Sequence, residues 1–278
     1  MDDQALSVTF WGVRGSIPAP GPGTVHYGGE TTCIEVNAGP HTVLVDCGSG
    51  ARLAGPSLAA RGITDLDVVF THTHMDHICG LPFFNLAYNP AVALRFWGSH
   101  TDGQPELEEI IERLMSPPIF PIPASSLKNT HFGPFTAGTD LTLGCGLTVG
   151  TTPLHHPGRA TGYKFEWAGA TVAIITDHEH GNPEIDAGVA AFVSGASLMV
   201  YDAMYTEEEY PNHVGWGHST PDKAVALGEA AGVGEVLLFH HDPRRDDATI
   251  AAADEALAKR GLKVRAARQG ETLVVAPR

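Results

Sequence analysis

The chain has 278 residues, of which 43% are hydrophobic and 18% charged, and its formal net charge is −15. This composition is typical of a folded globular protein and excludes a disordered or low-complexity chain. The negative charge argues against binding to long nucleic acids, which requires a surface rich in Lys and Arg. A small anionic substrate is compatible with that charge, because bound cations reverse the local field.

Residues 1–6 lack the basic segment and apolar run of a signal peptide, and no apolar stretch is long enough to span a membrane. Cys33, Cys47, Cys79 and Cys145 are widely spaced and form no CxxC pair. Scattered cysteines of this kind are typical of reduced thiols. We therefore expect a cytoplasmic protein with no membrane partner.

Three short alternating or apolar runs near the N-terminus predict β-strands at residues 6–10, 32–36 and 42–46. The first two are joined by a Gly- and Pro-rich loop at residues 12–29, and a loop of this length is either functional or loosely ordered. This loop contains Arg14, which is a candidate contact for a substrate phosphate.

The next apolar run, residues 66–70, predicts a buried strand that leads into Thr-His-Thr-His-Met-Asp-His. Four side chains capable of binding metal lie within six residues there: His72, His74, Asp76 and His77. In extended backbone His72 and His74 point to one side, and the other two can turn toward a second ion. Imidazole with carboxylate suits zinc, manganese or iron.

A helix is predicted at residues 105–115, and the prolines of residues 116–123 end it. We expect the Pro-rich segment 80–135 to form an insert that covers the site. No linker separates the two halves of the chain, so residues 1–278 are predicted to form a single domain.

The second half of the chain is again rich in predicted strands, with two helices near its end. The strands are expected at residues 141–149, 162–167, 170–176, 198–201 and 235–240. One helix should begin at Thr220 and Pro221, and the other should run from Asp247 to Gly261. These elements predict two sheets with helices outside them.

Further metal-capable groups stand where three of these strands end. They are His155 and His156 before Pro-Gly, Asp177, and the pair His240 and His241. Taken singly, each has an ordinary explanation as a loop or turn residue. Their repetition at strand ends predicts a site built on one rim of the sheets.

The ordered set of His and Asp residues, together with the Asp46-Cys-Gly turn, resembles the metallo-β-lactamase superfamily over essentially the whole chain. The resemblance implies an α/β fold, an αββα four-layer sandwich, with two divalent ions at the sheet edge. Zinc is the expected metal, with manganese and iron as alternatives. By position, one ion would be held by His72, His74 and His156, and the other by Asp76, His77 and His240. Asp177 would bridge them, and His155 and His241 are the alternatives to their neighbours.

The third motif, His156-Pro-Gly-Arg, has no His after the Gly, which is similar to the phosphodiesterase branch of that superfamily. This branch includes tRNA 3′-processing nucleases and cyclic-nucleotide and cyclic-phosphate phosphodiesterases. The resemblance implies that His218 handles a proton, that Asp202 orients it, and that Asp76 belongs to the catalytic set. Arg159 joins Arg14 as a candidate substrate contact.

The predicted function is hydrolysis of a small or cyclic nucleotide phosphodiester by a metal-bridged hydroxide. No Lys- or Arg-rich insertion is present to grip a long RNA. RNA 3′-end processing is the main alternative. A lactone or thioester hydrolase and a non-catalytic nucleotide sensor are further alternatives. Relatives in this branch are often dimers, so the resemblance allows a homodimer.

Overall fold

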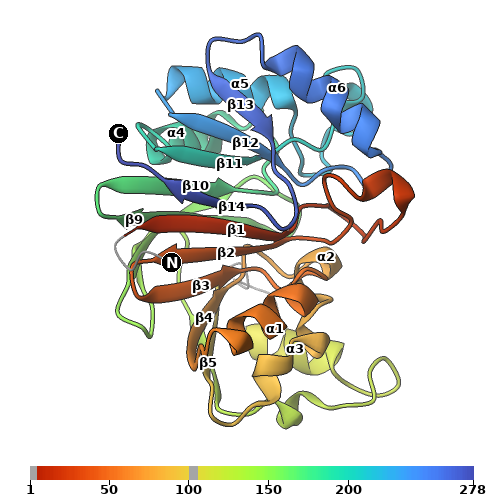
Figure 1. Ribbon diagram of the computed structural model, residues 1–278, viewed down its shortest axis with the longest axis vertical. Coiled ribbons are helices and arrows are strands. Elements are labelled where there is room, and N and C mark those ends of the chain that lie inside the picture. Colours follow the sequence, from red (N-terminus) through yellow and green to blue (C-terminus); the bar gives the residue numbers. More distant parts are fainter. Residues whose placement is uncertain (1–4, 100–105) are drawn as a thin grey trace.

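The strands form two seven-stranded sheets that lie face to face in the computed structural model, which describes residues 5–99 and 106–278 (Figure 1). The first sheet has the order β14 (Thr272–Val275), β1 (Leu6–Gly12), β2 (Cys33–Ala38), β3 (His41–Val45), β4 (Asp65–Val69), β5 (Ala93–Gly98) and β6 (Thr130–Pro134). The second has the order β13 (Lys263–Ala266), β12 (Glu235–Phe239), β11 (Leu198–Asp202), β10 (Ala170–Ile175), β9 (Ala160–Trp167), β8 (Thr148–Leu154) and β7 (Leu141–Thr142).

Helices cover the outer face of each sheet (Figure 1). The first sheet carries α1 (Ala51–Ala60) and α3 (Leu107–Leu114), and the second carries α4 (Pro183–Phe192), α5 (Pro221–Ala230) and α6 (Asp247–Leu257). The shorter elements are α2 (Met75–Ile78), η1 (Pro22–Thr24), η2 (Leu81–Phe83), η3 (Asn85–Tyr88), η4 (Ala124–Ser126) and η5 (Tyr210–Asn212). The predicted αββα sandwich is therefore confirmed.

The central core lies between the two sheets and explains why their strands form. Inward-facing side chains of β1, such as Val8 and Phe10, pack with Val172 and Ile174 of β10 and with Phe239 of β12. Separate apolar clusters fill the space between each sheet and its helices. Each sheet thus has two buried faces, which accounts for the apolar runs in the sequence.

The strand directions bring the ends of several strands to one edge of the sandwich. β3, β4 and β5 are parallel to one another, and so are β10, β11 and β12. β8 and β10 are both antiparallel to β9, so β8 runs in the same direction as β10. The residues that follow β8, β10, β11 and β12 therefore lie at one edge of the second sheet. The contact between His74 and His156 shows that the residues after β4 of the first sheet lie at this same edge, with the other predicted ligands.

Two sequence predictions for the middle of the chain need correction. In its described residues, segment 80–135 is an integral part of the sandwich rather than an added insert, because it supplies β5 and β6 to the first sheet and buried side chains such as Phe84 and Phe96 to the core. The predicted strand 141–149 is divided into β7 and the start of β8 by a turn. The predicted helix 105–115 is α3, with Pro105 outside the described residues.

The four cysteines are free thiols, and Cys33 and Cys47 are buried. Burial raises the pKa of Cys33 well above its usual value, which keeps this thiol protonated and unreactive. Across residues 5–99 and 106–278, no helix has both the length and the apolar character needed to cross a bilayer.

Candidate metal centre

One half of the centre is made of three histidines from two strand ends. His72 and His74 follow β4, and His156 follows β8. The Nε2 atom of His156 lies 3.0 Å from Nδ1 of His74, and the His72 ring centroid lies 4.6 Å from that of His156. His72 and His156 are buried while His74 is exposed, so this half opens to solvent on the side of His74. One ring nitrogen from each of the three histidines lies within 4.8 Å of the other two, close enough to share an ion.

The other half combines the first turn of α2 with the end of β12. The Oδ2 atom of Asp76 lies 3.5 Å from Nε2 of His77 and 3.2 Å from Nε2 of His240. All three side chains are buried. They form a second compact group of one carboxylate and two imidazoles.

Asp177 lies between the two halves and presents one carboxylate oxygen to each. Its Oδ2 is 3.8 Å from Nε2 of His72 and 3.9 Å from Nε2 of His156. Its Oδ1 is 3.3 Å from Nε2 of both His77 and His240. A carboxylate placed in this way can bridge two cations. Asp177 has a left-handed φ of 58°, which turns the chain sharply where β10 ends.

Burial and charge set the protonation of these groups. Burial lowers the pKa of His72 well below its usual value and that of His156 to about 4, so both rings are neutral near pH 7. Burial also lowers the pKa of His77, but the carboxylates around it, led by Asp177 and Asp76, raise it well above its usual value. A neutral imidazole is the form that binds a metal, and a cation between the carboxylates would replace the His77 proton.

The donor set fits two divalent cations. The Nε2 atoms of His72 and His77 are buried and have no hydrogen-bond partner within the part of the chain that the structure describes. Buried polar nitrogens without partners are rare and need an explanation such as an absent ion. Nitrogen and oxygen ligands in this mixture suit zinc or similar transition metals.

Hydrogen-bond acceptors on the outer side of His77 and His156 fix which ring nitrogen of each histidine faces the centre. The Nδ1 atom of His77 donates to Oδ2 of Asp46 over 2.8 Å, and Nδ1 of His156 donates to the Gly217 carbonyl over 2.9 Å. In both rings Nε2 is then free to act as the ligand. From the sequence, Asp46 was predicted only to be part of a turn. Its contact with His77 could not be predicted from local patterns because 31 residues separate the two.

His218 and Asp202 form a pair beside Asp177. The Nδ1 atom of His218 donates to Oδ2 of Asp202 over 2.8 Å and lies 3.9 Å from Oδ2 of Asp177. Burial lowers the pKa of His218, but Asp202 outweighs it and raises the value to about 9. Asp202 also accepts the backbone N–H groups of Asp177 and Ser219, so the pair is rigidly held.

The Gly- and Pro-rich N-terminal loop contacts the centre through its backbone. The Ser16 N–H donates to Oδ2 of Asp76 over 2.7 Å. A Cβ at Gly15 would lie 2.4 Å from Nδ1 of His240, so only glycine allows this approach. The backbone of this loop thus holds the Asp76 carboxylate and packs against the His240 ring, a role that its Gly- and Pro-rich composition alone did not predict.

Arg14 is not placed to contact a substrate, which corrects the sequence prediction. Its side chain is fully buried. The guanidinium donates to the carbonyl of Gly28 over 2.7 Å, and to those of Asp242 and Arg245 over 3.1 and 2.7 Å. Arg14 therefore ties the N-terminal loop to the segment that follows β12.

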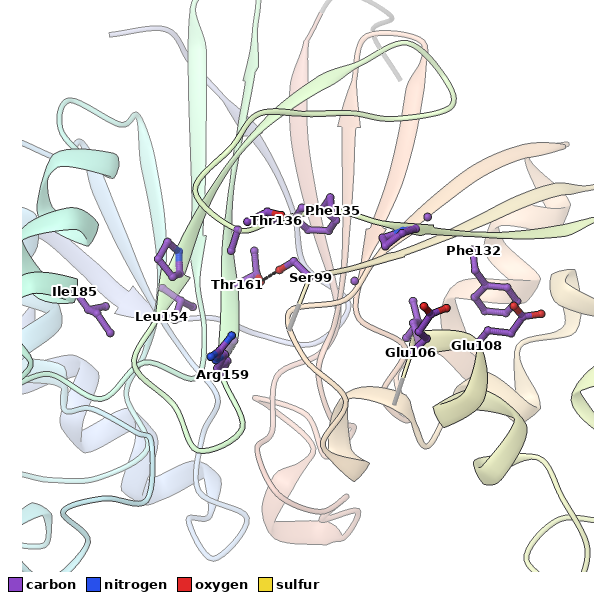
Figure 2. Close-up of a pocket in the computed structure, with 17 residues that line it drawn as sticks. Ser99, Glu106, Glu108, Phe132, Phe135, Thr136, Leu154, Arg159, Thr161 and Ile185 are labelled. Atoms are coloured by element: carbon purple, nitrogen blue, oxygen red, sulfur yellow. Dashed lines mark hydrogen bonds between the residues drawn. The ribbon is translucent and has the colours of Figure 1, made fainter. Parts of the chain in front are cut away.

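Arg159, the other predicted substrate contact, is exposed and lines a cavity of about 760 Å³ (Figure 2). Across this cavity lie Ser99 and Thr161, whose hydroxyls are 2.5 Å apart, and the ring of Phe135. The Thr161 N–H donates to the Thr71 carbonyl, next to His72. The cavity therefore lies on the same rim as the metal-capable groups.

The two alternative histidines point elsewhere. The Nδ1 atom of His155 donates to the Glu179 carbonyl over 3.0 Å, and Nε2 of His241 donates to the Ala267 carbonyl over 3.2 Å. Both are thus engaged with backbone, while His156 and His240 face Asp177. The structure therefore brings together the seven predicted ligands and leaves their neighbours outside.

The chain is similar to known proteins in sequence and in fold. Residues 41–241, more than half of the chain, match the family described as "Beta-lactamase superfamily domain". A protein named Ribonuclease Z from Mycobacterium sp. (strain KMS) is 27% identical over 268 residues, which cover 86% of this chain and 85% of that protein.

Two solved structures show the same fold. The metallo-beta-lactamase fold protein YhfI from Bacillus subtilis superposes with a TM-score of 0.73 at 20% identity, covering 97% of this chain and 99% of that one. A diphosphatase from the PhnP family superposes with a TM-score of 0.71 at 16% identity, covering 98% of each chain. At these identities the likeness concerns the fold.

Proposed function

The chain belongs to the beta-lactamase superfamily, and on that basis we propose that it is a di-metal phosphodiesterase that hydrolyses a small or cyclic nucleotide phosphodiester. The observation that carries the proposal is the position of Asp177, with one oxygen toward His72 and His156 and the other toward His77 and His240. The relative named Ribonuclease Z supports phosphodiester chemistry.

The residues proposed to hold the ions are those of the two groups around Asp177. His72, His74 and His156 would hold one ion, Asp76, His77 and His240 the other, and Asp177 would touch both. We propose zinc as the metal, with manganese and iron as alternatives. When bound, two such ions lower the pKa of a shared water and stabilise charge on a phosphoryl oxygen.

His218 is proposed to protonate the leaving group. Its Nδ1–H is donated to Asp202, so Nε2 is the atom that can give a proton to the departing oxygen. A ribose alkoxide is a poor leaving group and needs this help. Asp202 would keep the ring oriented and favour its protonated form. Asp76, held by the Ser16 N–H, completes the proposed catalytic set.

A small substrate is favoured by charge and by the position of Arg159. The net charge of −15 opposes long anionic polymers. Arg159 lies on the cavity beside the centre, where a cationic side chain can bind a phosphate or a ribose. We propose that the enzyme acts in the cytoplasm, which the unpaired cysteines favour. A homodimer without nucleic-acid or membrane partners completes the proposal.

The second candidate function is RNA 3′-end processing, favoured by the name of the 27% identical relative. The two functions are separated by a turnover panel of 3′,5′-cyclic AMP, a 2′,3′-cyclic nucleotide, bis(p-nitrophenyl) phosphate, a lactone and a structured precursor tRNA. Turnover of the small diesters with little cleavage of the RNA supports the proposal. Preferential cleavage of the precursor at its 3′ end would replace it with the second candidate.

Asp177→Ala tests the proposed site. We expect the variant to bind at most one ion per chain and to lose diester turnover by at least about 10³-fold, because both groups lose their shared ligand. Asp140→Ala, an exposed position, is the matched control and should keep both ions and full activity. An Asp177→Ala protein with wild-type metal content and rate would remove this residue from the site.

A further inference from the structure

The loop at residues 213–218, between η5 and α5, serves the centre in two ways. It carries the His218 ring, and its Gly217 carbonyl accepts the Nδ1–H of His156 over 2.9 Å. A Cβ at Gly217 would lie 2.0 Å from Nδ1 of His156, and φ is +87° at this position. The loop thus lies directly against a proposed metal ligand, and its position sets the direction of that ring.

The carboxylate of Glu179 holds this loop in place. Its Oε1 accepts the Gly215 N–H over 2.7 Å and the Tyr210 hydroxyl over 3.1 Å, and its Oε2 accepts the Gly217 N–H over 2.8 Å. The residue is only 3% exposed. A buried carboxylate is costly unless its oxygens are well hydrogen-bonded, as they are here.

The backbone of Glu179 is tied to the segment that carries His156. Its N–H donates to the His155 carbonyl over 2.8 Å, and its carbonyl accepts from Nδ1 of His155 over 3.0 Å. Two residues earlier along the chain lies Asp177. Glu179 therefore joins the end of β10, the loop after β8 and the loop 213–218.

The hydrogen bond from His156 to the Gly217 carbonyl determines which ring nitrogen of His156 carries the proton. A carbonyl oxygen only accepts, so the bond to Gly217 requires the proton on Nδ1 and leaves the lone pair on Nε2. Nε2 is the atom that faces His74 and Asp177. Moving loop 213–218 would release the ring and its tautomer together.

We propose that Glu179 is a positioning residue for the ion held by His72, His74 and His156, acting through the Gly217 carbonyl and the ring of His156. This inference rests on the proposed function, because it takes those three histidines as ligands of one ion. It predicts that Glu179 affects the two ions unequally. Among the described residues, the hydrogen bonds of Glu179 go to His155, Tyr210, Gly215 and Gly217 and not to Asp76, His77 or His240, so this second group should keep its ion.

Glu179→Gln is the sharpest test, because it preserves the side-chain shape. The amide NH₂ would face a backbone N–H whichever way it is turned, since each carboxylate oxygen accepts one. Glu184→Gln makes the same chemical change at an exposed position in the first turn of α4 and serves as the matched control. The full chain is stripped of metal and titrated with Zn²⁺ and with Co²⁺.

We expect wild type and Glu184→Gln to bind two ions. Glu179→Gln should bind one ion about 10- to 100-fold more weakly, as is typical when an outer hydrogen bond to a histidine ligand is lost. The Co²⁺ absorption of that ion should change, and the other ion should bind as in wild type. Unchanged affinities and spectrum, even with a lower melting temperature of the metal-free protein, would overturn the inference by making Glu179 merely structural.

Failure of the proposed function has a different signature. A wild-type chain that binds no ion, or two ions without any diester turnover, would refute the proposed enzyme whatever Glu179 does. If Glu179→Gln does not fold, Gly217→Ala tests the same link from the other side, because the added Cβ must displace His156. Selective weakening of one ion in Gly217→Ala supports the inference, and two unchanged affinities would refute it.

Discussion

His218→Ala separates proton donation from metal binding. His218 donates its Nδ1–H to Asp202 over 2.8 Å, and its ring stacks on that of His240 with centroids 4.9 Å apart. Removing the ring leaves the groups around Asp177 intact but removes the proton available at Nε2. General acid catalysis contributes about 10²–10⁴-fold, which corresponds to about 2.7–5.4 kcal/mol of activation free energy at 1.36 kcal/mol per factor of ten.

The effect should depend on the leaving group. We expect kcat on 3′,5′-cyclic AMP to fall by that factor, because a ribose alkoxide must be protonated. On bis(p-nitrophenyl) phosphate the fall should be less than about tenfold, because p-nitrophenolate leaves without a proton. Steady-state rates on both substrates and metal analysis of the same samples measure this.

The control is His213→Ala, which removes a ring from the same loop. His213 stacks on Tyr205 with centroids 4.2 Å apart and belongs to neither proposed ligand set. It should leave the ratio of the two rates unchanged. Because His218, Asp202, Asp177 and His240 are also close enough to share a cation, metal content matters. Equal losses on both substrates, or loss of an ion in His218→Ala, would refute the proton-donor role.

Three other substitutions test buried polar contacts outside the two ligand groups. Asp46→Asn should weaken one ion about 10- to 100-fold in a metal titration, since His77 loses its carboxylate partner. Arg14→Lys should lower the free energy of unfolding, measured with urea, by about 2–3 kcal/mol and leave KM unchanged. The reason is that the buried Arg14 guanidinium donates hydrogen bonds to three carbonyls, which a lysine cannot all reach. Burial raises the pKa of the Asp67 carboxyl, but its hydrogen bonds to Arg95 outweigh burial and lower the pKa overall. The ionised Asp67 therefore stabilises the folded protein above the unfolded pKa of about 3.9, and this stabilisation is lost as the pH falls through the lower pKa of the folded state. Asp67→Asn should accordingly be destabilising at pH 7, and its effect should shrink as the pH falls below the unfolded pKa, as measured by urea unfolding over a series of acidic pH values.

The predicted ligand positions could be taken from the sequence because they follow a simple local rule. An apolar run that ends in His or Asp places that side chain at a strand terminus, and parallel strands bring such termini to one edge. Asp177 after β10 and His240 after β12 are examples. The choice of His156 over His155 came from the resemblance, since both residues follow the same strand.

The roles of Arg14 and Glu179 and the formation of α1 depend on contacts between distant parts of the chain, which local sequence patterns do not predict. Arg14 in a Gly-rich loop has the composition of a phosphate contact, and only the fold shows that carbonyls far along the chain enclose it. Helix α1 was not predicted, because Gly55 and Pro56 interrupt its pattern; packing of Ala54 and Leu58 in the core stabilises it instead. Glu179 lies close to Asp177 in sequence, but its partners at 210–217 are set by the fold.

The most direct test of the account is a measurement of the metals themselves. Crystals of the full chain loaded with Zn²⁺ would be examined by anomalous diffraction at the zinc edge. The account predicts two peaks about 3.5–4 Å apart, on either side of the Asp177 carboxylate. A single peak, or a pair that Asp177 does not touch, would contradict it.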